Sequence, residues 1–272
     1  MIHNIMSEFL GTALMIVFGV GVHCDEVLNK TKYRGSGHLF AITTWGFGIT
    51  IVLMVFGGVC INPAMAFAQA ILGMIPWNCF IPYCVAEFLG GLCGACIVYV
   101  MYADHFKASE NVVDSVAIRN IFSTNPNIRN LSRNFFVEAF DTFVFLSSIL
   151  GIAKYSEKML PIGVGILVWA VGMGLGGPTG FAMNPARDLG PRLAYTLLPI
   201  KNKLNSSSSS GSTSLMNGSS ASRQGKNIFP LRLVCNLSSY RPSNNRTYNP
   251  LVYPLQISMS SLRHSSSLTS IS

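Results

Sequence analysis

Five long apolar runs, separated by polar loops, dominate the first 200 residues of the chain. A helix needs about 20 apolar residues to cross the hydrocarbon core of a membrane, and these runs approach or exceed that length. The predicted spans are residues 5–22, 39–59, 80–102, 135–152 and 160–175. The pattern therefore predicts an all-α protein that crosses a membrane several times.

Two shorter segments interrupt this pattern, and each begins with the same triplet inside an apolar, glycine-rich stretch. The triplets are Asn62-Pro63-Ala64 and Asn184-Pro185-Ala186. Asn is a favoured N-cap and Pro is favoured at the first helical position, so each triplet predicts a helix start. The helices expected over 63–72 and 185–198 are short, and at 1.5 Å per residue each reaches about half way across a membrane.

The spans and short helices repeat in the same order. In each half, a span that carries a glutamate (Glu8 or Glu138) precedes a second span and then the triplet. The first copy contains three full spans, so the second copy starts on the opposite side of the membrane, as in an inverted repeat with two re-entrant half-helices. We expect the first repeat over 1–102, a connecting extracellular loop over 103–134 and the second repeat over 135–200.

In this arrangement the N-termini of the half-helices meet near the middle of the membrane. The positive ends of two helix dipoles then face each other, and the two Asn side chains present amide donors at the same point. Such a spot repels cations and offers hydrogen bonds. It suits a pore that passes neutral molecules and excludes protons.

Charge is scarce and unevenly placed. Only 11% of the residues are charged, whereas about a quarter are in an average soluble domain. The formal net charge of +8 comes from residues 201–272, which carry eight Lys or Arg and no acid, while residues 1–200 are balanced. The basic character therefore does not indicate nucleic-acid binding. Cys93 and Cys96 are spaced like a metal-binding pair, but their Gly-rich span favours a role in helix packing, and we expect no metal.

The second repeat lacks a visible sixth span, because the sequence after Ile200 is rich in Ser and Asn. One interpretation is a native disordered tail over 201–272 that is drawn to anionic lipid. The interpretation that we favour is out-of-frame translation that replaces a sixth span. Loss of that span would leave the second half-helix with unpaired backbone facing lipid, which predicts impaired folding or conduction.

These motifs resemble the aquaporin superfamily, or major intrinsic protein family, and within it the aquaglyceroporin or glycerol facilitator branch. Paired Asn-Pro-Ala triplets with Arg187 after the second carry the resemblance, and Asp188 is similar to the glycerol-conducting branch. The resemblance implies a selectivity filter near the outer mouth, made by Trp45, Gly172, Phe181 and Arg187. Their chemistry agrees, since two aromatic walls and a fixed guanidinium suit the carbon chain and hydroxyls of a polyol.

The resemblance also implies that Glu8, Glu138 and Asp188 support the half-helices. It implies a homotetramer in the plasma membrane, without a cofactor and without enzymatic activity. One departure lies before the first triplet, where only 16 residues separate Trp45 from Asn62 and where Cys60 and Ile61 stand in place of the family's usual Gly-Ala-His.

Three functions are weighed against these residues. A passive channel for glycerol, similar small neutral solutes and some water explains the two triplets. A proton-coupled carrier or a path for a weak acid such as lactic acid would need a chain of ionisable groups, whereas the spans hold isolated acids, among them Glu87 and Asp141. We interpret Glu87 as structural and leave the role of Asp141 open. A membrane enzyme would need a cluster of His, Asp or Cys at catalytic spacing, and the sequence has none.

Overall fold

The computed structural model describes residues 2–203, which belong to one compact unit. Throughout this part of the chain the secondary structure is helical. The helices are α1 (Ile2–Val27), α2 (His38–Phe56), α3 (Pro63–Ile71), α4 (Trp77–Met101), α5 (Ala103–Ser109), α6 (Ser115–Phe122), α7 (Leu131–Tyr155), the 3-10 turn η1 (Glu157–Met159), α8 (Leu160–Gly174) and α9 (Pro185–Leu197). The prediction that no sixth span follows residue 200 concerns residues 204–272, outside the described part.

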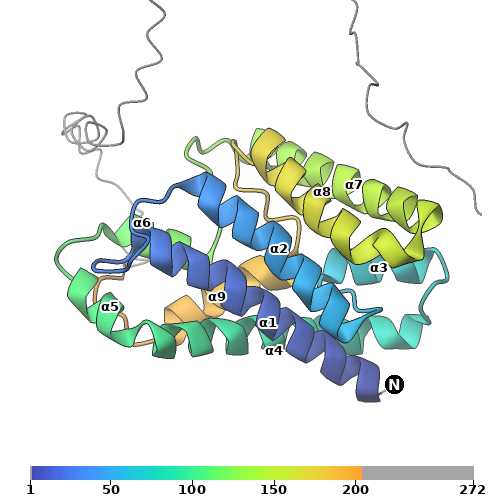
Figure 1. Ribbon diagram of the computed structural model, residues 1–272, viewed down its shortest axis with the longest axis horizontal. Coiled ribbons are helices and arrows are strands. Elements are labelled where there is room, and N and C mark those ends of the chain that lie inside the picture. The colour runs from blue at the N-terminus through green and yellow to red at the C-terminus, as the bar shows by residue number, and fades with distance from the viewer. Residues whose placement is uncertain (1, 204–272) are drawn as a thin grey trace, which may run out of the picture. The chain divides into compact units, whose positions relative to one another are not determined.

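Five of the described helices are long and apolar enough to cross a membrane. They are α1, α2, α4, α7 and the continuous stretch of η1 and α8, which confirms the five predicted spans (Figure 1). The first span is longer than expected. We predicted its end at residue 22, but α1 continues to Val27 and draws His23 and Glu26 into the helix, although polar side chains suggested a loop there.

Glycines allow the long helices to approach each other closely. The face of α4 that carries Gly90, Gly91 and Gly94 packs on α1 and α9. A Cβ at Gly94 would lie 2.5 Å from the carbonyl oxygen of Ala13, and one at Gly91 would lie 2.7 Å from that of Ala186. Real side chains do not reach such distances, so this packing requires glycine, as is common where membrane helices cross.

A second close crossing joins α2 to α8. A Cβ at Gly46 would lie 2.8 Å from the carbonyl oxygen of Gly165, and one at Gly165 would meet the side chain of Thr50. The helices α7 and α8 lie side by side in Figure 1, next to α3. Together these contacts place α3 and α9 between the long helices.

The segment 103–134, expected as a plain polar loop, contains two short helices. Asp114 caps α6 by accepting hydrogen bonds from the backbone N–H groups of Val116 and Ala117. On α5 and α6, Phe106, Ile118 and Phe122 are buried. The connection is therefore a packed element that covers one end of the helix bundle.

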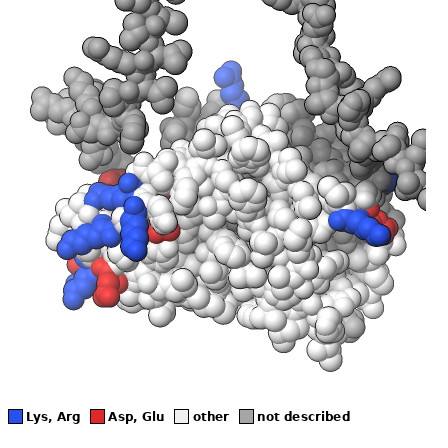
Figure 2. Space-filling model, in the orientation of Figure 1, with Lys and Arg blue, Asp and Glu red and all other residues white. Residues whose placement is uncertain are grey.

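Charged residues are gathered at the ends of this bundle. Figure 2 shows that most Lys, Arg, Asp and Glu side chains on the visible face lie toward its left and right ends, and that the wide middle is uncharged. This distribution is what a bilayer requires, because the middle faces hydrocarbon and the ends face water.

Candidate functional site: a cavity between two half-helices

Both half-helices begin where the Asn-Pro-Ala triplets predict. The side-chain oxygen of Asn62 accepts a hydrogen bond from Ala64 N at 2.9 Å, and that of Asn184 accepts from Ala186 N at 3.0 Å and Arg187 N at 3.2 Å. Pro follows each Asn at the first helical position. The local capping rules therefore suffice to start α3 and α9.

The two Asn side chains also cross-link the halves of the chain. Asn62 Nδ2 donates to the carbonyl oxygen of Met183 at 3.1 Å, and Asn184 Nδ2 donates to that of Ile61 at 2.7 Å. The bonds are reciprocal, as the inverted repeat implies. Each amide has a second N–H, so one donor of each remains for another acceptor.

Glutamates hold the strained approaches to both half-helices. Glu8 accepts from the backbone N–H groups of Cys60 and Ile61, both at 2.7 Å. Glu138 accepts from those of Ala182 and Met183, at 3.2 and 3.0 Å. These segments need support, because Ile61 (φ 46°) and Met183 (φ 48°) lie in the left-handed region, which non-glycine residues rarely adopt.

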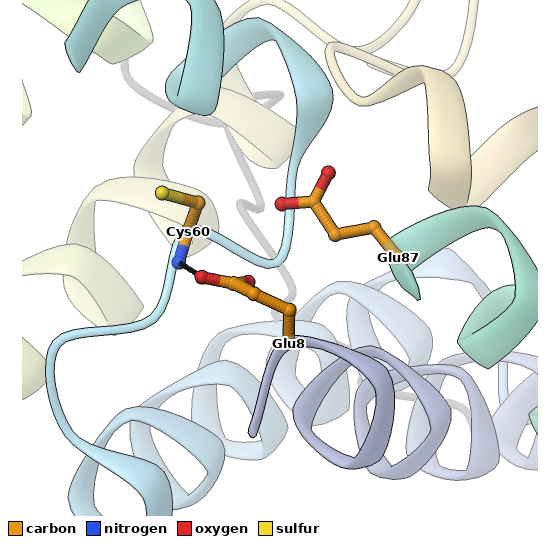
Figure 3. Close-up of side chains that lie close together, drawn as sticks. All are labelled: Glu8, Cys60 and Glu87. Atoms are coloured by element: carbon orange, nitrogen blue, oxygen red, sulfur yellow. Dashed lines mark hydrogen bonds between the residues drawn. The ribbon is translucent and has the colours of Figure 1, made fainter. Parts of the chain in front are cut away.

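A third acid joins the first approach. Figure 3 shows Glu8 from α1 and Glu87 from α4 converging on the segment that carries Cys60, with a hydrogen bond from Cys60 N to Glu8. Glu87 accepts from Asn62 N at 2.9 Å. One possible ligand atom from each of the three residues lies within 4.8 Å of the others, as in a metal site. Three of the four carboxylate oxygens, however, already accept backbone N–H bonds, so this cluster serves the backbone.

A cavity of about 320 Å³ runs past both Asn side chains. Its wall comes from α1, α2, α3, α7, η1, α8, α9 and both approaches, so both halves of the chain contribute to it. Apolar side chains make up most of the lining. Polar groups are few and include Asn62, Asn184, Gln69 and Arg187.

Three of the four predicted filter residues line this cavity. They are Trp45, Phe181 and Arg187, and the guanidinium carbon of Arg187 lies 4.4 Å from the ring centroid of Trp45. Among residues 2–203 no acceptor takes a hydrogen bond from the Arg187 side chain, so its donors are available to a solute. Gly172 lies behind the aromatic wall, since a Cβ there would be 3.0 Å from Phe181 Cζ and 2.8 Å from a methyl carbon of Ile42.

Asp188 supports α9 from another side. Its carboxylate accepts from the backbone N–H of Thr124 at 2.9 Å and from its hydroxyl at 3.0 Å, and it pairs with Arg192 at 2.8 Å. It therefore ties the connecting segment to the second half-helix. Asp141 is buried on α7 but does not line the cavity, and its Oδ2 lacks a hydrogen-bond partner in the described residues.

Sequence reasoning missed two polar pairs at this site. Cys60 Sγ donates to Gln69 Oε1 at 3.2 Å on the cavity wall. Trp45 Nε1 donates to His23 Nε2 at 3.2 Å. The sequence held no local signal for the second pair, because the polar residues from His23 onward predicted a loop.

Comparison with known proteins decides the family. The sequence model of the family described as "Major intrinsic protein" matches residues 1–202. The chain belongs to the major intrinsic protein family. This membership confirms the resemblance seen in the two triplets, and with the five apolar helices it identifies a multi-pass membrane protein.

Relatives of this major intrinsic protein point to the aquaglyceroporin branch. It is 68% identical over 207 residues to glycerol uptake facilitator protein 4 of Lactiplantibacillus plantarum, and 65% identical over 207 residues to a D/L-lactic acid transporter of the same organism. Each match covers 76% of this chain and 87% of the relative. Among solved structures, the aquaglyceroporin of Plasmodium falciparum matches with a TM-score of 0.63 and 25% identity, covering 74% of this chain and 84% of that one.

Proposed function

We propose that this chain is a passive channel for glycerol and similar small neutral solutes, with some water, in the plasma membrane. The observation that carries the proposal is the cavity in which an aromatic wall, Trp45 and Phe181, faces the free donors of Arg187. The aromatic rings suit the carbon backbone of a polyol, and the guanidinium suits its hydroxyl oxygens. The names of the relatives support the same solute class.

In this channel a solute passes the filter residues Trp45, Phe181 and Arg187, with Gly172 behind them, and then the donors of Asn62 and Asn184. The positive ends of α3 and α9 flank that point and disfavour cations. Glu8, Glu138 and Asp188 keep the half-helices in place. No step needs a cofactor, because passage breaks no covalent bond.

Stopped-flow shrinkage and reswelling of proteoliposomes tests the channel, with glycerol as the solute. We expect a glycerol flux that rises linearly with the gradient. Gly172→Ala should reduce the glycerol flux about tenfold and the water flux less, because the added methyl group pushes Phe181 toward the passage. A tenfold reduction corresponds to a barrier increase of about 1.4 kcal/mol. Gly174→Ala on the same helix, where a Cβ meets nothing within 4 Å, is the matched control. A saturable flux driven by a proton gradient would contradict the proposal.

A weak acid is the second candidate solute, favoured by the relative named as a D/L-lactic acid transporter. A neutral-solute channel would pass lactic acid in its protonated form only. Lactic acid flux should then rise as the pH falls, in proportion to the undissociated fraction. With the same pH on both sides of the membrane, the channel should not concentrate the acid, and accumulation against its gradient under that condition would identify a carrier instead.

We also propose the repeat boundaries 1–102 and 135–200, and a homotetramer, as the family resemblance implies. Mass measurement of the purified protein in lipid nanodiscs tests the assembly, since four copies are expected and a single copy would contradict it.

The Ser-rich segment 201–272 has a separate test. Reading the gene in its other frames after codon 200 should find a hydrophobic span if translation out of frame replaced it.

A further inference from the structure

The indole ring of Trp45 is held in place from three sides. On one side Gly19 of α1 leaves the space that the ring fills, because a Cβ there would collide with its six-membered ring. Arg187 lies on another side, 4.4 Å from the ring centroid. On the third side the indole N–H donates to His23 Nε2 at 3.2 Å. Trp45 is buried, so this bond is one of few polar contacts available to it.

His23 can accept this bond only in one state. An imidazole nitrogen accepts a hydrogen bond only while it carries no proton, so Nε2 must be bare and the single ring proton must be on Nδ1. That nitrogen faces Glu26 Oε2 at 3.5 Å, which suits a protonated Nδ1. The carboxylate of Glu26 thus favours, by charge attraction and without a hydrogen bond, the tautomer that accepts from Trp45.

A line of polar groups connects this bond to the surface. Glu26 Oε1 lies 3.6 Å from Nδ1 of His38, whose side chain is 87% exposed, whereas that of His23 is 18% exposed. The charged or titratable groups that face His23 are Glu26 on its own helix, His38 at the start of α2 and Arg187 on α9. A proton can therefore reach His23 from the water at this end of the bundle.

We propose that His23 is a positioning residue that determines the selectivity of the filter. This role rests on the proposed glycerol channel: His23 fixes the indole of Trp45 against Arg187 and thereby fixes the shape of the cavity wall at the filter. Protonation of Nε2 removes the acceptor, frees the indole and weakens discrimination between glycerol and water. The selectivity of the filter for glycerol over water therefore depends on the pH on the side of the membrane where His38 is exposed.

Two substitutions at position 23 distinguish the effect of the hydrogen bond from the effect of side-chain size. His23→Leu removes the acceptor, while His23→Gln keeps an acceptor oxygen that does not titrate near neutral pH. The ratio of glycerol to water permeability in proteoliposomes should fall about fivefold in His23→Leu, the weight of one ordinary hydrogen bond, and stay near wild type in His23→Gln. In the wild type the ratio should fall as the pH is lowered from about 8 to about 4, because only an unprotonated Nε2 accepts the bond, and in His23→Gln it should stay flat.

Removal of the donor tests whether His23 acts through Trp45. In a Trp45→Phe background, which lacks the indole N–H, His23→Leu should cause no further change in the ratio. A full fivefold loss there would overturn the proposal, as would identical pH profiles of wild type and His23→Gln. The second comparison decides the matter even where His23→Leu fails to fold.

A spectroscopic measurement separates this inference from the proposed transport. The chain has three tryptophans, and Trp77 and Trp169 are exposed on the apolar surface, so both can be replaced by Phe. The fluorescence emission of Trp45, the one tryptophan left, should then change with pH when residue 23 is His and should not change with pH in His23→Gln. Emission that ignores pH overturns the role of His23, whereas a pH response without glycerol flux overturns only the proposed function.

Discussion

At the scale of single residues, the first approach is stabilised by carboxylates that bond to the backbone. Glu8 takes two consecutive N–H groups and Glu87 takes the next one, at Asn62. These N–H groups precede a helix in an apolar environment, where water cannot replace a lost acceptor. The acids are therefore part of the architecture of the half-helix, and the solute passage depends on them indirectly.

Removal of one carboxylate should cost stability in proportion to the bonds lost. Glu8→Ala leaves two buried N–H groups unpaired, at about 1–3 kcal/mol each. We expect a clearly lower midpoint of thermal unfolding for the purified protein in detergent, and a similar loss for Glu138→Ala, its counterpart in the second half. Glu157→Ala, at a site that bonds to neither approach, is the control. A midpoint for Glu8→Ala equal to that of the control would contradict this account.

At the scale of helices, close packing depends on where glycines stand, more than on their number. Gly94 on α4 faces the backbone of α1, whereas Gly21 on α1 faces open space. Both are helical, so the same substitution has opposite consequences at the two positions. Alanine improves helix propensity at either site, but only at Gly94 does its methyl group collide with a carbonyl oxygen.

The pair gives a matched test of helix packing. Gly21→Ala should stabilise the protein slightly, by up to about 1 kcal/mol, because it limits the backbone freedom of the unfolded chain. Gly94→Ala should destabilise it by about 1–3 kcal/mol, the usual cost of overpacking. Thermal unfolding in detergent compares the two directly. Equal shifts would mean that α1 and α4 can separate without cost.

Features that depend on neighbouring residues could be predicted from the sequence, whereas contacts between residues far apart in the chain could not. The starts of α3 and α9 were predictable because an Asn N-cap and a following Pro act locally. The pairing of Glu8 and Glu138 with the approaches came from repeat order and family resemblance. The bond between His23 and Trp45 was out of reach, since it depends on α1 running on to Val27 through residues that look like a loop.

At the scale of the whole molecule, the two halves are joined at their most strained points. Ile61 and Met183, both in the left-handed region, each supply a carbonyl oxygen to the Asn of the other half. The described helices around this joint differ in how much of their apolar surface is buried. More than half of the apolar window of α1 is buried, against 17% of that of α7, so α7 faces the surroundings. In a bilayer those surroundings are lipid or a neighbouring chain.

Two substitutions at Asn184 distinguish its cap from its cross-link. Serine is a good N-cap, but it lacks the amide that reaches Ile61, so Asn184→Ser should lose only the bond between the halves, about 0.5–3 kcal/mol with the carbonyl left buried. Asn184→Ala should lose about 1 kcal/mol more, because the helix start is then uncapped. The order wild type, Ser, Ala in thermal midpoint is the expected result. A Ser variant as stable as wild type would show that the cross-link contributes nothing.

The reciprocal Asn bonds also set an order for biogenesis. Asn62 finds its partner Met183 only 121 residues later in the chain. At a translation rate of about 5–20 residues per second, the ribosome needs roughly 6–24 seconds to supply that partner. During this interval the side-chain amide of Asn62 lacks the acceptor that it has in the folded chain. The factors that insert and shelter nascent membrane proteins therefore have a defined window in which this chain depends on them.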